Sequence, residues 1–395
     1  MSFLKQTFID PIKEFIHDSR SIGILLLVCT AISLVIANLS FGEKYLAFWN
    51  AEFHLAHNLY LPHSLLHFIN DGLMALFFFL AGMEIKHEML EGELASPQRA
   101  ALPVAAAIGG MIAPAIIFSL FNKATVFQPG WGIPTATDIA FSLGVASLLG
   151  KRVPDSLKIF LTALAIIDDL GAIVIIALFY GSSIKLVWLA ASLCIIAFIY
   201  FINKKMRFGW LQIALGVLLW YCVFNSGVHA TIAGVLFALL VPGNLLTTYC
   251  NKLHHLVNFA IMPLFALANT AIIFPDNPVT ALTSTLSLGI IAGLFIGKPL
   301  GIYTASYIVI KKKWAALSSD ITQAHLVGAG VLAGIGFTMS IFISTLAFSD
   351  PAYQDIAKVA VLAGSVASMI AGYFWLRSLH TRKQRQVTSN ATVKQ

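Results

Sequence analysis

Apolar runs of about 20 residues, the length of helix that spans a bilayer, recur along the whole chain between short segments that hold most of the charge. They are too long and too uniformly apolar for amphipathic strands. The pattern therefore predicts an all-α membrane protein with about twelve transmembrane helices. We expect them near residues 21–40, 66–86, 100–121, 133–150, 155–180, 185–202, 210–225, 228–242, 256–274, 286–308, 323–346 and 356–376.

The two ends of the chain differ from this pattern. Residues 1–20 place Asp10, Glu14 and Asp18 among apolar positions, which is typical of an amphipathic surface helix and not of a cleaved signal. Residues 377–395 are basic and polar, so we expect a disordered cytoplasmic tail. Residues 21–376 would then form a single helical domain.

Composition supports the membrane assignment. Of 395 residues, 58% are hydrophobic and 11% are charged, and the mean hydropathy is +0.84, so the chain has too little polar surface for a soluble globule. The four cysteines have no paired spacing, and neither a disulfide framework nor a zinc site is indicated.

The net charge of +7 and the pI of about 9.2 raise the question of nucleic-acid binding. If the N-terminus is cytoplasmic, twenty of the 25 Lys and Arg residues fall on the cytoplasmic side. Four fall outside (Lys44, Lys123, Lys185 and Lys358), and Lys298 lies inside a predicted span. This asymmetry satisfies the positive-inside rule. The basic charge therefore indicates a topology with both termini cytoplasmic, and it gives no reason to expect nucleic acid.

Asp168 and Asp169 stand side by side within an apolar run that extends from about residue 157 to residue 179. A central Asp on a membrane helix costs about 2.5–3.5 kcal/mol by insertion scales, and such a residue is by default a functional-site candidate. Lys298 is the only centrally placed cation, so we predict that it pairs with Asp168.

Two of the predicted spans contain helix breakers. In the fourth, Gly132-Ile133-Pro134 is followed by Thr137 and Asp138, and in the eleventh Gly334-Ile335-Gly336 is followed by Thr338. Backbone can leave helical geometry at membrane depth only where protein or a water-filled cavity satisfies it. Two interrupted helices in corresponding positions of two halves point to a transporter site. The alternative is that Thr137 and Asp138 only cap a buried helix.

Other polar residues allow two interpretations each. Asp71 either caps the start of the second span or belongs to a site. Glu84 and Glu88 lie four residues apart, and with Lys86 and His87 they form either a functional cluster at the cytoplasmic mouth or an ordinary solvated helix end. His229 either titrates near neutral pH or is a hydrogen-bonded interior histidine.

Two further segments resemble binding motifs only in part. Residues 41–63 are predicted to lie outside, where His54 and His57 suggest either a metal site or, with better support, an interfacial segment or hairpin that packs on a partner subunit. Residues 293–298 resemble a phosphate-binding loop, but the spacing is one residue short, Pro299 replaces the required Ser or Thr, and no strand precedes it. ATP binding is therefore not expected.

The chain resembles the NhaA-type sodium/proton antiporters from about Asn70 to Arg377. Six motifs in the same order carry the resemblance. They are Asn70-Asp71-Gly72-Leu73-Met74-Ala75, Thr137-Asp138-Ile139-Ala140-Phe141, Ala165-Ile166-Ile167-Asp168-Asp169-Leu170-Gly171-Ala172-Ile173, Ser226-Gly227-Val228-His229-Ala230-Thr231, Gly297-Lys298-Pro299-Leu300-Gly301 and Gly334-Ile335-Gly336-Phe337-Thr338-Met339-Ser340-Ile341.

The resemblance implies twelve spans, with spans three to five repeated in inverted form as spans ten to twelve and the two broken helices crossing at the midplane. It implies pH-regulated, electrogenic exchange of external protons for cytoplasmic Na⁺ or Li⁺ in a bacterial inner membrane, by a homodimer without a cofactor. We expect the dimer contact at residues 41–63.

Residue roles follow from the same motifs. The resemblance implies an ion and proton site at Asp168 and Asp169, with charge compensation at the broken helices by Asp138 and Lys298. It also implies pH sensing or cation entry at Glu84, His87, Glu88, His229 and His254. His87 stands where members often have Arg, and residues 250–255 lack an acidic residue often found there. These departures affect the expected pH set point, not the transport chemistry.

Na⁺ must exchange water for protein oxygens, and a carboxylate that binds Na⁺ can bind a proton in its place. Burial and a neighbouring like charge both favour the protonated form of such a group. Adjacent helix residues point about 100° apart, so Asp168 and Asp169 cannot face the same partner. With Asp168 on Lys298, we expect Asp169 to be the principal Na⁺ ligand, and Thr137 with freed carbonyls to complete the shell.

Other functions are less consistent with these residues. A sodium-coupled symporter would need polar groups around a larger cavity, and an intramembrane protease would need two Asp residues on separate elements that face each other. A channel would lack coupling, and a buried ion network without a transport role would not explain two broken helices. An antiporter therefore remains the expectation.

Overall fold

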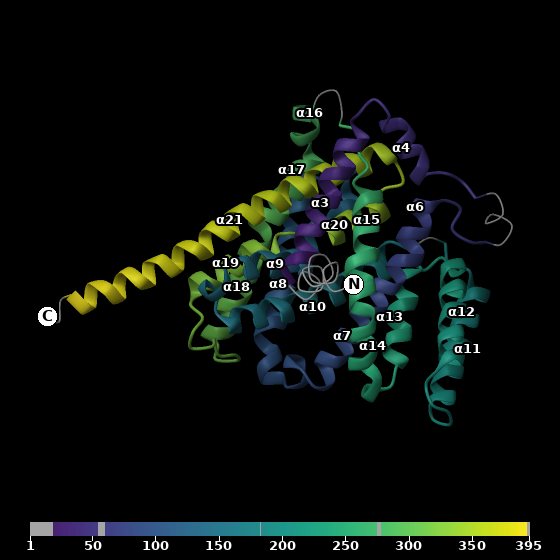
Figure 1. Ribbon diagram of the computed structural model, residues 1–395, viewed down its shortest axis with the longest axis horizontal. Helices are drawn as coiled ribbons and strands as arrows, with labels where there is room; N and C mark the ends of the chain where they lie inside the picture. The colour runs from purple at the N-terminus through teal and green to yellow at the C-terminus, as the bar shows by residue number, and fades with distance from the viewer. Residues whose placement is uncertain (1–18, 54–59, 182, 275–277, 393–395) are drawn as a thin grey trace, which may run out of the picture. The chain divides into compact units, whose positions relative to one another are not determined.

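The structure is a computed structural model that describes residues 19–53, 60–181, 183–274 and 278–392 (Figure 1). Within these ranges the regular secondary structure is helical, with one isolated antiparallel bridge between Glu52 and Ser64. The chain divides into two compact units. The first unit is Met1–Ile24, Ser96–Asp168 and Asn277–Gln395, and the second unit is Leu25–Ala95 and Asp169–Asp276.

Among the described residues, six helices are long and apolar enough to cross a bilayer, or up to nine if each of three bent helix pairs is one span. The prediction of twelve spans differs for two reasons. It also includes the shorter apolar helix at Trp210–Ser226 and the interrupted fourth segment, and it counts the eighth and ninth predicted segments as two spans. In the structure, segments eight and nine form a pair bent by 108°. The prediction of an all-α polytopic membrane protein is confirmed.

The first unit contains the predicted third and fourth spans, the start of the fifth, and the predicted tenth to twelfth spans. Its helices are α8 (Pro97–Phe121), η4 (Gln128–Thr135), α9 (Ile139–Leu148), η5 (Gly150–Arg152), α16 (Pro278–Leu282), α17 (Thr285–Ala292), η8 (Gly293–Gly297), α18 (Lys298–Lys311), α19 (Gln323–Ala333), α20 (Phe337–Ala347) and α21 (Pro351–Thr392). The helix α10 (Asp155–Phe179) begins in this unit and ends in the second. The last predicted span continues as one helix to Thr392, and residues 1–18 lie outside the described part of the chain.

The glycine strip of the tenth span brings two helices into close contact. A Cβ atom on Gly301 would collide with the carbonyl of Gly109, and a Cβ atom on Gly109 would collide with the carbonyl of Gly301. Towards the other end, Gly297 lies against Pro114 and Gly289 against Phe118. Because residue numbers rise on α8 as they fall along α17, η8 and α18, the third and tenth spans run antiparallel, as an inverted repeat requires.

A short link joins α9 to α10. Gly150 has a φ of +56°, which favours glycine, and it begins the single turn that connects the two helices. Pro154 precedes α10, where its missing N–H removes no helical hydrogen bond. Asp138 thus lies at the start of α9, and α10, which carries Asp168, follows directly after the end of α9.

The second unit contains the end of α3 (Ser19–Ala37), which begins in the first unit, and the end of α10. It also contains α4 (Gly42–Trp49), α6 (Leu65–Phe68), η2 (Ile69–Leu73), α7 (Met74–Leu90), η3 (Glu93–Ala95), α11 (Leu186–Asn203), α12 (Trp210–Ser226), α13 (Thr231–Leu240), η6 (Gly243–Leu245), α14 (Leu246–Leu256), η7 (Val257–Ile261) and α15 (Met262–Asn269). The helical part of segment nine begins at Leu246, before the predicted residue 256. A search for apolar runs finds only the apolar part of a helix. It therefore misses a more polar beginning such as Leu246–Leu256.

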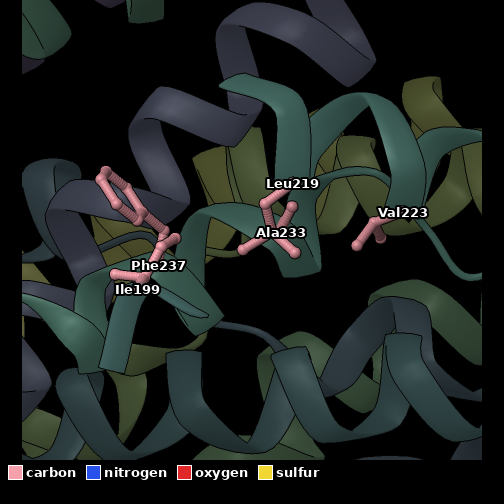
Figure 2. Close-up of a cluster of buried hydrophobic side chains, with 5 residues drawn as sticks. All are labelled: Ile199, Leu219, Val223, Ala233 and Phe237. Atoms are coloured by element: carbon pink, nitrogen blue, oxygen red, sulfur yellow. The ribbon is translucent and has the colours of Figure 1, made fainter. Parts of the chain in front are cut away.

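One hydrophobic core of the second unit lies where α11, α12 and α13 meet. The buried side chains of this core come from all three helices, and Figure 2 shows the five of them, which are Ile199, Leu219, Val223, Ala233 and Phe237. The helices α11 and α12 pack side by side (Figure 1). Next to Ala233 on α13, Gly234 packs against the carbonyl of Ala75 on α7. This close approach fixes α7, which carries several of the predicted site residues.

Candidate functional site

The two interrupted segments meet in the first unit. The fourth consists of the 3₁₀-helix η4, extended residues 136–138 and α9. The eleventh consists of α19 and α20, which are bent by 48° at residues 334–336. Ser340 Oγ donates to the Ile133 carbonyl at 2.7 Å, and Ser142 Oγ donates to the Leu332 carbonyl at 2.9 Å. These contacts show that the segments run antiparallel, and they satisfy backbone groups that the breaks leave without helical partners.

Asp138 joins the positive ends of two half-helices. Its Oδ1 accepts from the Phe141 N–H at 3.2 Å and so caps α9, while its Oδ2 accepts from the N–H of Thr338 at 3.1 Å and from the Thr338 hydroxyl, at the start of α20. The Asp138 N–H donates to the Ile335 carbonyl at 2.7 Å. A carboxylate is stabilised at a helix N-terminus. Asp138 therefore caps α9 and also accepts hydrogen bonds at the start of α20.

Lys298 is completely buried and contacts Asp168, as the sequence predicts. Its Nζ lies 2.5 Å from Asp168 Oδ2 and donates to Thr137 Oγ1 at 2.8 Å. The π-helix η8 ends at Gly297, so Lys298 follows a widened turn. The ammonium of Lys298 neutralises this buried carboxylate. Among the described contacts of the first unit, Asp168 has no other cation to balance its charge.

Thr137 connects this ion pair to the negative end of α19. Its Oγ1 lies 2.7 Å from Asp168 Oδ2 and 2.8 Å from the carbonyl oxygen of Ala333, the last residue of α19. The hydroxyl has one hydrogen, so it can donate to only one of these two acceptors at a time. Thr137 therefore contacts the end of α19.

Asp168 and Asp169 are both buried on α10. The boundary between the two compact units falls between them. Among the described residues, Asp168 Oδ1 has no hydrogen-bond partner, whereas Oδ2 has both Lys298 and Thr137. Asp168 therefore keeps one carboxylate oxygen that can accept a ligand.

Asp71 lies in the second unit between two histidines. Its Oδ2 is 2.6 Å from His67 Nε2, and its Oδ1 is 3.3 Å from His229 Nε2. His229 Nδ1 in turn lies 3.0 Å from Thr231 Oγ1. The cap interpretation of Asp71 is wrong: α6 begins at Leu65 and is capped by Ser64, and Asp71 lies within η2 inside the same helical stretch.

The predicted cytoplasmic cluster has separate partners. Lys86 Nζ donates to the carbonyls of Leu239 and Val241 at 2.7 and 2.6 Å, and so holds α7 against the end of α13. Glu88 Oε2 accepts from the Glu93 N–H at 2.9 Å. Glu84 lies one turn before Glu88 on α7 and is partly buried. This end of α7 is therefore held by hydrogen bonds from Lys86 to the end of α13 and from the Glu93 N–H to Glu88.

Of the remaining histidines of the prediction, His87 is half-buried and His254 is exposed. His87 Nδ1 is 3.8 Å from Glu91 Oε2, and His254 Nε2 is 3.0 Å from Asn258 Nδ2. The helix α14, which carries His254, packs on α7. His54 and His57 fall in the range 54–59, outside the described residues. Among the described residues, no cluster of three or more His, Cys, Asp or Glu side chains could hold a metal ion.

Sequence reasoning missed two features of α21. Ser365 on α21 accepts the Phe337 N–H at 3.1 Å and caps α20 from another helix. Lys358, assigned above to an outer segment, is buried in α21 with its Nζ 3.5 Å from Asp355 Oδ1. The three-residue spacing of Asp355 and Lys358 was a usable signal for that pair. No signal in the sequence identifies Ser365, because its partner is a backbone group far along the chain.

This fold and this site define a multi-pass membrane protein with buried charges held at two interrupted, antiparallel helices. The chain belongs to the family described as Na⁺/H⁺ antiporter 1, whose family model matches residues 13–376.

Relatives that are named Na⁺/H⁺ antiporters align with almost the whole chain. The "Na(+)/H(+) antiporter NhaA 2" of Flavobacterium johnsoniae is 47% identical over 94% of this chain and 94% of that relative. The "Na(+)/H(+) antiporter NhaA 2" of Clostridium beijerinckii is 44% identical over 97% of this chain and 98% of the relative. The "Na(+)/H(+) antiporter NhaA" of Vibrio cholerae is 46% identical over 93% of this chain and 97% of the relative.

Proposed function

We propose that this protein is a secondary antiporter, not an enzyme, and that it exchanges external protons for cytoplasmic Na⁺ or Li⁺ without a cofactor or ATP. The observation that carries the proposal is the buried contact of Lys298 with Asp168 and Thr137 beside the two helix breaks. Membership of the Na⁺/H⁺ antiporter 1 family and the names of the relatives support it.

The oxygens at this site suit Na⁺. Asp168 Oδ1 is available as a ligand, Asp169 follows on the same helix, and Thr137 Oγ1 lies 2.7 Å from Asp168 Oδ2. When the Thr137 hydroxyl donates to the Ala333 carbonyl, its lone pairs face the carboxylate side, where they can bind a cation. An arriving Na⁺ replaces the Lys298 ammonium as the counter-charge of Asp168, and Asp169 is the principal ligand.

Competition couples the two ions. A carboxylate oxygen can hold either Na⁺ or a proton, so protons arriving from outside release Na⁺, and Na⁺ arriving from the cytoplasm releases protons. The titration belongs to the interacting group of Asp168, Asp169 and Lys298 and not to one residue. Because more than one proton can leave for each Na⁺, the exchange is electrogenic.

Asp138 has a different role in this proposal. It neutralises the N-terminal ends of α9 and α20 and keeps them together, and it has no direct contact with Asp168 among the described hydrogen bonds. Its loss weakens the breaks without removing an ion ligand. Asp138→Asn keeps the shape of the side chain and one carbonyl acceptor, so we expect partial activity.

Everted membrane vesicles test these roles. Na⁺-dependent proton movement, followed by the fluorescence of a pH dye, should be abolished in Asp169→Asn and retained in part in Asp138→Asn at equal protein levels. Asp155→Asn, at the exposed start of the same helix, is the matched control and should behave as the native chain. Full activity in Asp169→Asn would refute the assignment of the ion site.

A sodium-coupled symporter of an organic solute is the alternative. Its binding site would need polar groups around a larger cavity, whereas the second unit's cavity of about 490 Å³ is lined almost wholly by apolar side chains, including Phe68, Phe79, Trp220 and Phe237. Solute uptake by proteoliposomes in a Na⁺ gradient would favour this alternative. A Na⁺ flux that ignores an imposed pH gradient would instead indicate a channel.

We further propose that pH regulates the exchange through Glu84, His87, Glu88, His229 and His254. His87 and Glu88 share the end of α7, on which α14 with His254 packs, so protonation there changes the charge at a helix contact. His87→Arg should shift the pH profile of exchange without changing its maximum. An unchanged profile would remove His87 from the sensor.

The location and assembly follow from the charge distribution and the family. We propose a bacterial cytoplasmic membrane with both termini cytoplasmic, and a homodimer formed through residues 41–63. Tagged copies should co-purify when this segment is intact and separate when it is deleted. Co-purification without the segment would place the dimer contact elsewhere.

A further inference from the structure

Four titratable side chains of the second unit lie in a row, from the exposed His63 to the mostly buried His229. The Nδ1 atoms of His63 and His67 are 3.1 Å apart. His67 Nε2 is 2.6 Å from one oxygen of Asp71, and the other oxygen is 3.3 Å from His229 Nε2. The side chain of His67 is 30% exposed and that of Asp71 is 13% exposed. His67 therefore stands between the surface and a buried carboxylate.

The contact with Asp71 determines which ring nitrogen of His67 carries the hydrogen. An ionised carboxylate can only accept hydrogen bonds, so Nε2 of His67 is the donor. In a neutral imidazole the other nitrogen, Nδ1, then carries no hydrogen, and its lone pair faces His63. A carboxylate on one side of the ring also favours a positive charge on the ring. His67 is therefore a base whose proton-accepting nitrogen points towards the exposed side.

His229 gives Asp71 a second donor. Nδ1 of His229 accepts the Thr231 backbone N–H at 3.4 Å, so the hydrogen of the neutral ring is on Nε2, which faces Asp71. Two N–H groups thus point to one carboxylate, and the three side chains together carry the single negative charge of Asp71. One added proton on His67 makes this partly buried group neutral, which lowers the cost of its burial.

The other neighbours of His67 and Asp71 are neutral. The helix α12 contributes aromatic side chains, and the Trp220 indole N–H donates to the Asp71 carbonyl at 2.8 Å. The rest of α6 and the first turn of α7 are apolar, and α15 contributes an amide at its contact with η2. The helix α4, which packs on α6, carries Glu43 and Lys44. Among the described residues, neither these two nor any other Lys, Arg or Glu contacts His67 or Asp71.

We propose that His67 is a binding site for protons that arrive from the predicted outer side, with His63 as the entry group and Asp71 as the counter-charge. A proton that binds His63 lets the hydrogen on its Nδ1 pass to Nδ1 of His67, which becomes an imidazolium. His67 becomes neutral again when its Nε2 hydrogen passes to Asp71, or when the proton returns to His63. Each transfer moves one proton and needs no other reactant.

The inner end of the row lies beside the helix that carries Asp169. Thr231, which contacts His229, lines a small pocket together with Ile173 and Ile176 of α10. Ile173 is one turn after Asp169 on that helix, and all these residues belong to the second unit. The inference rests on the proposed function, because external protons must reach the α10 carboxylates and this site collects them on the side from which they come.

A purely structural role for His67 would be a polar bridge within the second unit. Such a bridge needs only the N–H group that His67 directs at Asp71. Glutamine can supply an N–H donor in its place, but its amide does not bind a proton near neutral pH. His67→Gln therefore keeps the bridge and removes the proton site.

A proton titration of the purified protein tests the site without any transport. The native chain and His67→Gln are titrated in choline chloride between about pH 5 and pH 8, where histidine changes its charge. EDTA is present, because a transition metal held by the two Nδ1 atoms would also displace protons. The native chain should take up about one proton more per molecule than the variant. Equal uptake would overturn the proposal, whatever the protein transports.

Proteoliposomes of one orientation test the entry of protons from outside. With the pH on the cytoplasmic side held constant, the external pH of half-maximal Na⁺ exchange should fall by about one unit in His67→Gln, because a tenfold higher proton concentration is then needed. The maximal rate at low external pH should stay as in the native chain. His325→Gln is the matched control, since glutamine suits the third position of the capped helix α19, and its profile should not change.

An unchanged external pH profile in His67→Gln, or a change only in the response to cytoplasmic pH, would overturn the proposal. A native chain that moves no protons in response to Na⁺ would instead refute the proposed function. The titration would then still decide whether His67 binds a proton.

Discussion

Lys298→Met gives the sharpest test of the buried ion pair. The variant keeps an unbranched side chain, shorter by the terminal ammonium nitrogen, but leaves Asp168 with a buried negative charge and only the Thr137 hydroxyl as a described donor. Breaking a completely buried ion pair in this way costs about 3–5 kcal/mol. At about 2 °C per kcal/mol for a large domain, the melting temperature should fall by roughly 6–10 °C.

The same reasoning also predicts the stability of a double variant. Lys298→Met combined with Asp168→Asn removes both charges and leaves a neutral amide beside Thr137, so most of the lost stability should return. The assay is thermal unfolding of the four proteins in one detergent, followed by tryptophan fluorescence. The deficit of Lys298→Met alone should shrink as the pH falls, because a proton can then neutralise Asp168. A double variant as unstable as the sum of the two single variants would refute the reasoning.

Two further predictions concern packing and a surface hydrogen bond. Gly301→Ala should lower the melting temperature and the folded yield by an overpacking cost of about 1–3 kcal/mol, because its Cβ would meet the Gly109 carbonyl, whereas Gly209→Ala, with its nearest atom at 4.0 Å, should not. Hydrogen bonds from Ser156 Oγ at 2.5 Å and from a second serine lower the pKa of the exposed Asp320 carboxyl. A lowered pKa stabilises the fold above the ordinary Asp pKa of about 3.9 and loses this contribution as the pH falls through the folded-state pKa. Ser156→Ala should therefore lower the melting temperature slightly at neutral pH, and this effect should fade as the pH is lowered through the folded-state pKa of Asp320. An effect that does not change with pH would contradict this.

The class of fold and the centre of the site could be predicted from particular residues. The apolar runs required membrane helices, and the glycines and proline near Thr137 and Gly336 required interruptions at membrane depth. A buried lysine must find an anion, and Asp168 and Asp169 were the strongest candidates. The contact of Lys298 with Asp168 follows from this reasoning, and the structure contains it.

Contacts between side chains and distant backbone could not be predicted. Ser365 caps α20 across 28 residues, and Thr137 reaches the Ala333 carbonyl across 196 residues. A membrane helix is apolar on every side, so its sequence does not indicate which face meets which neighbour. Such partners depend on the packing of several helices together, and the pattern along one helix does not contain that information.

The interpretation of Asp71 failed for a related reason. A polar residue near the start of an apolar run is usually a cap. In this chain Ser64 starts the helix seven residues earlier, and Asp71 turns inward to His67 and His229. His67 and Asp71 are four residues apart, which was a signal of contact on one helix face. His229 could be assigned to this group only from the structure.

Proton release on addition of Na⁺ to the purified protein tests the central claim most directly. The claim is that Na⁺ and protons compete for the buried carboxylates of α10. In weakly buffered detergent solution, NaCl should release protons from the native chain and from Asp155→Asn, choline chloride should release none, and Asp169→Asn should release none with either salt. Native protein that binds Na⁺ without releasing protons would contradict the account.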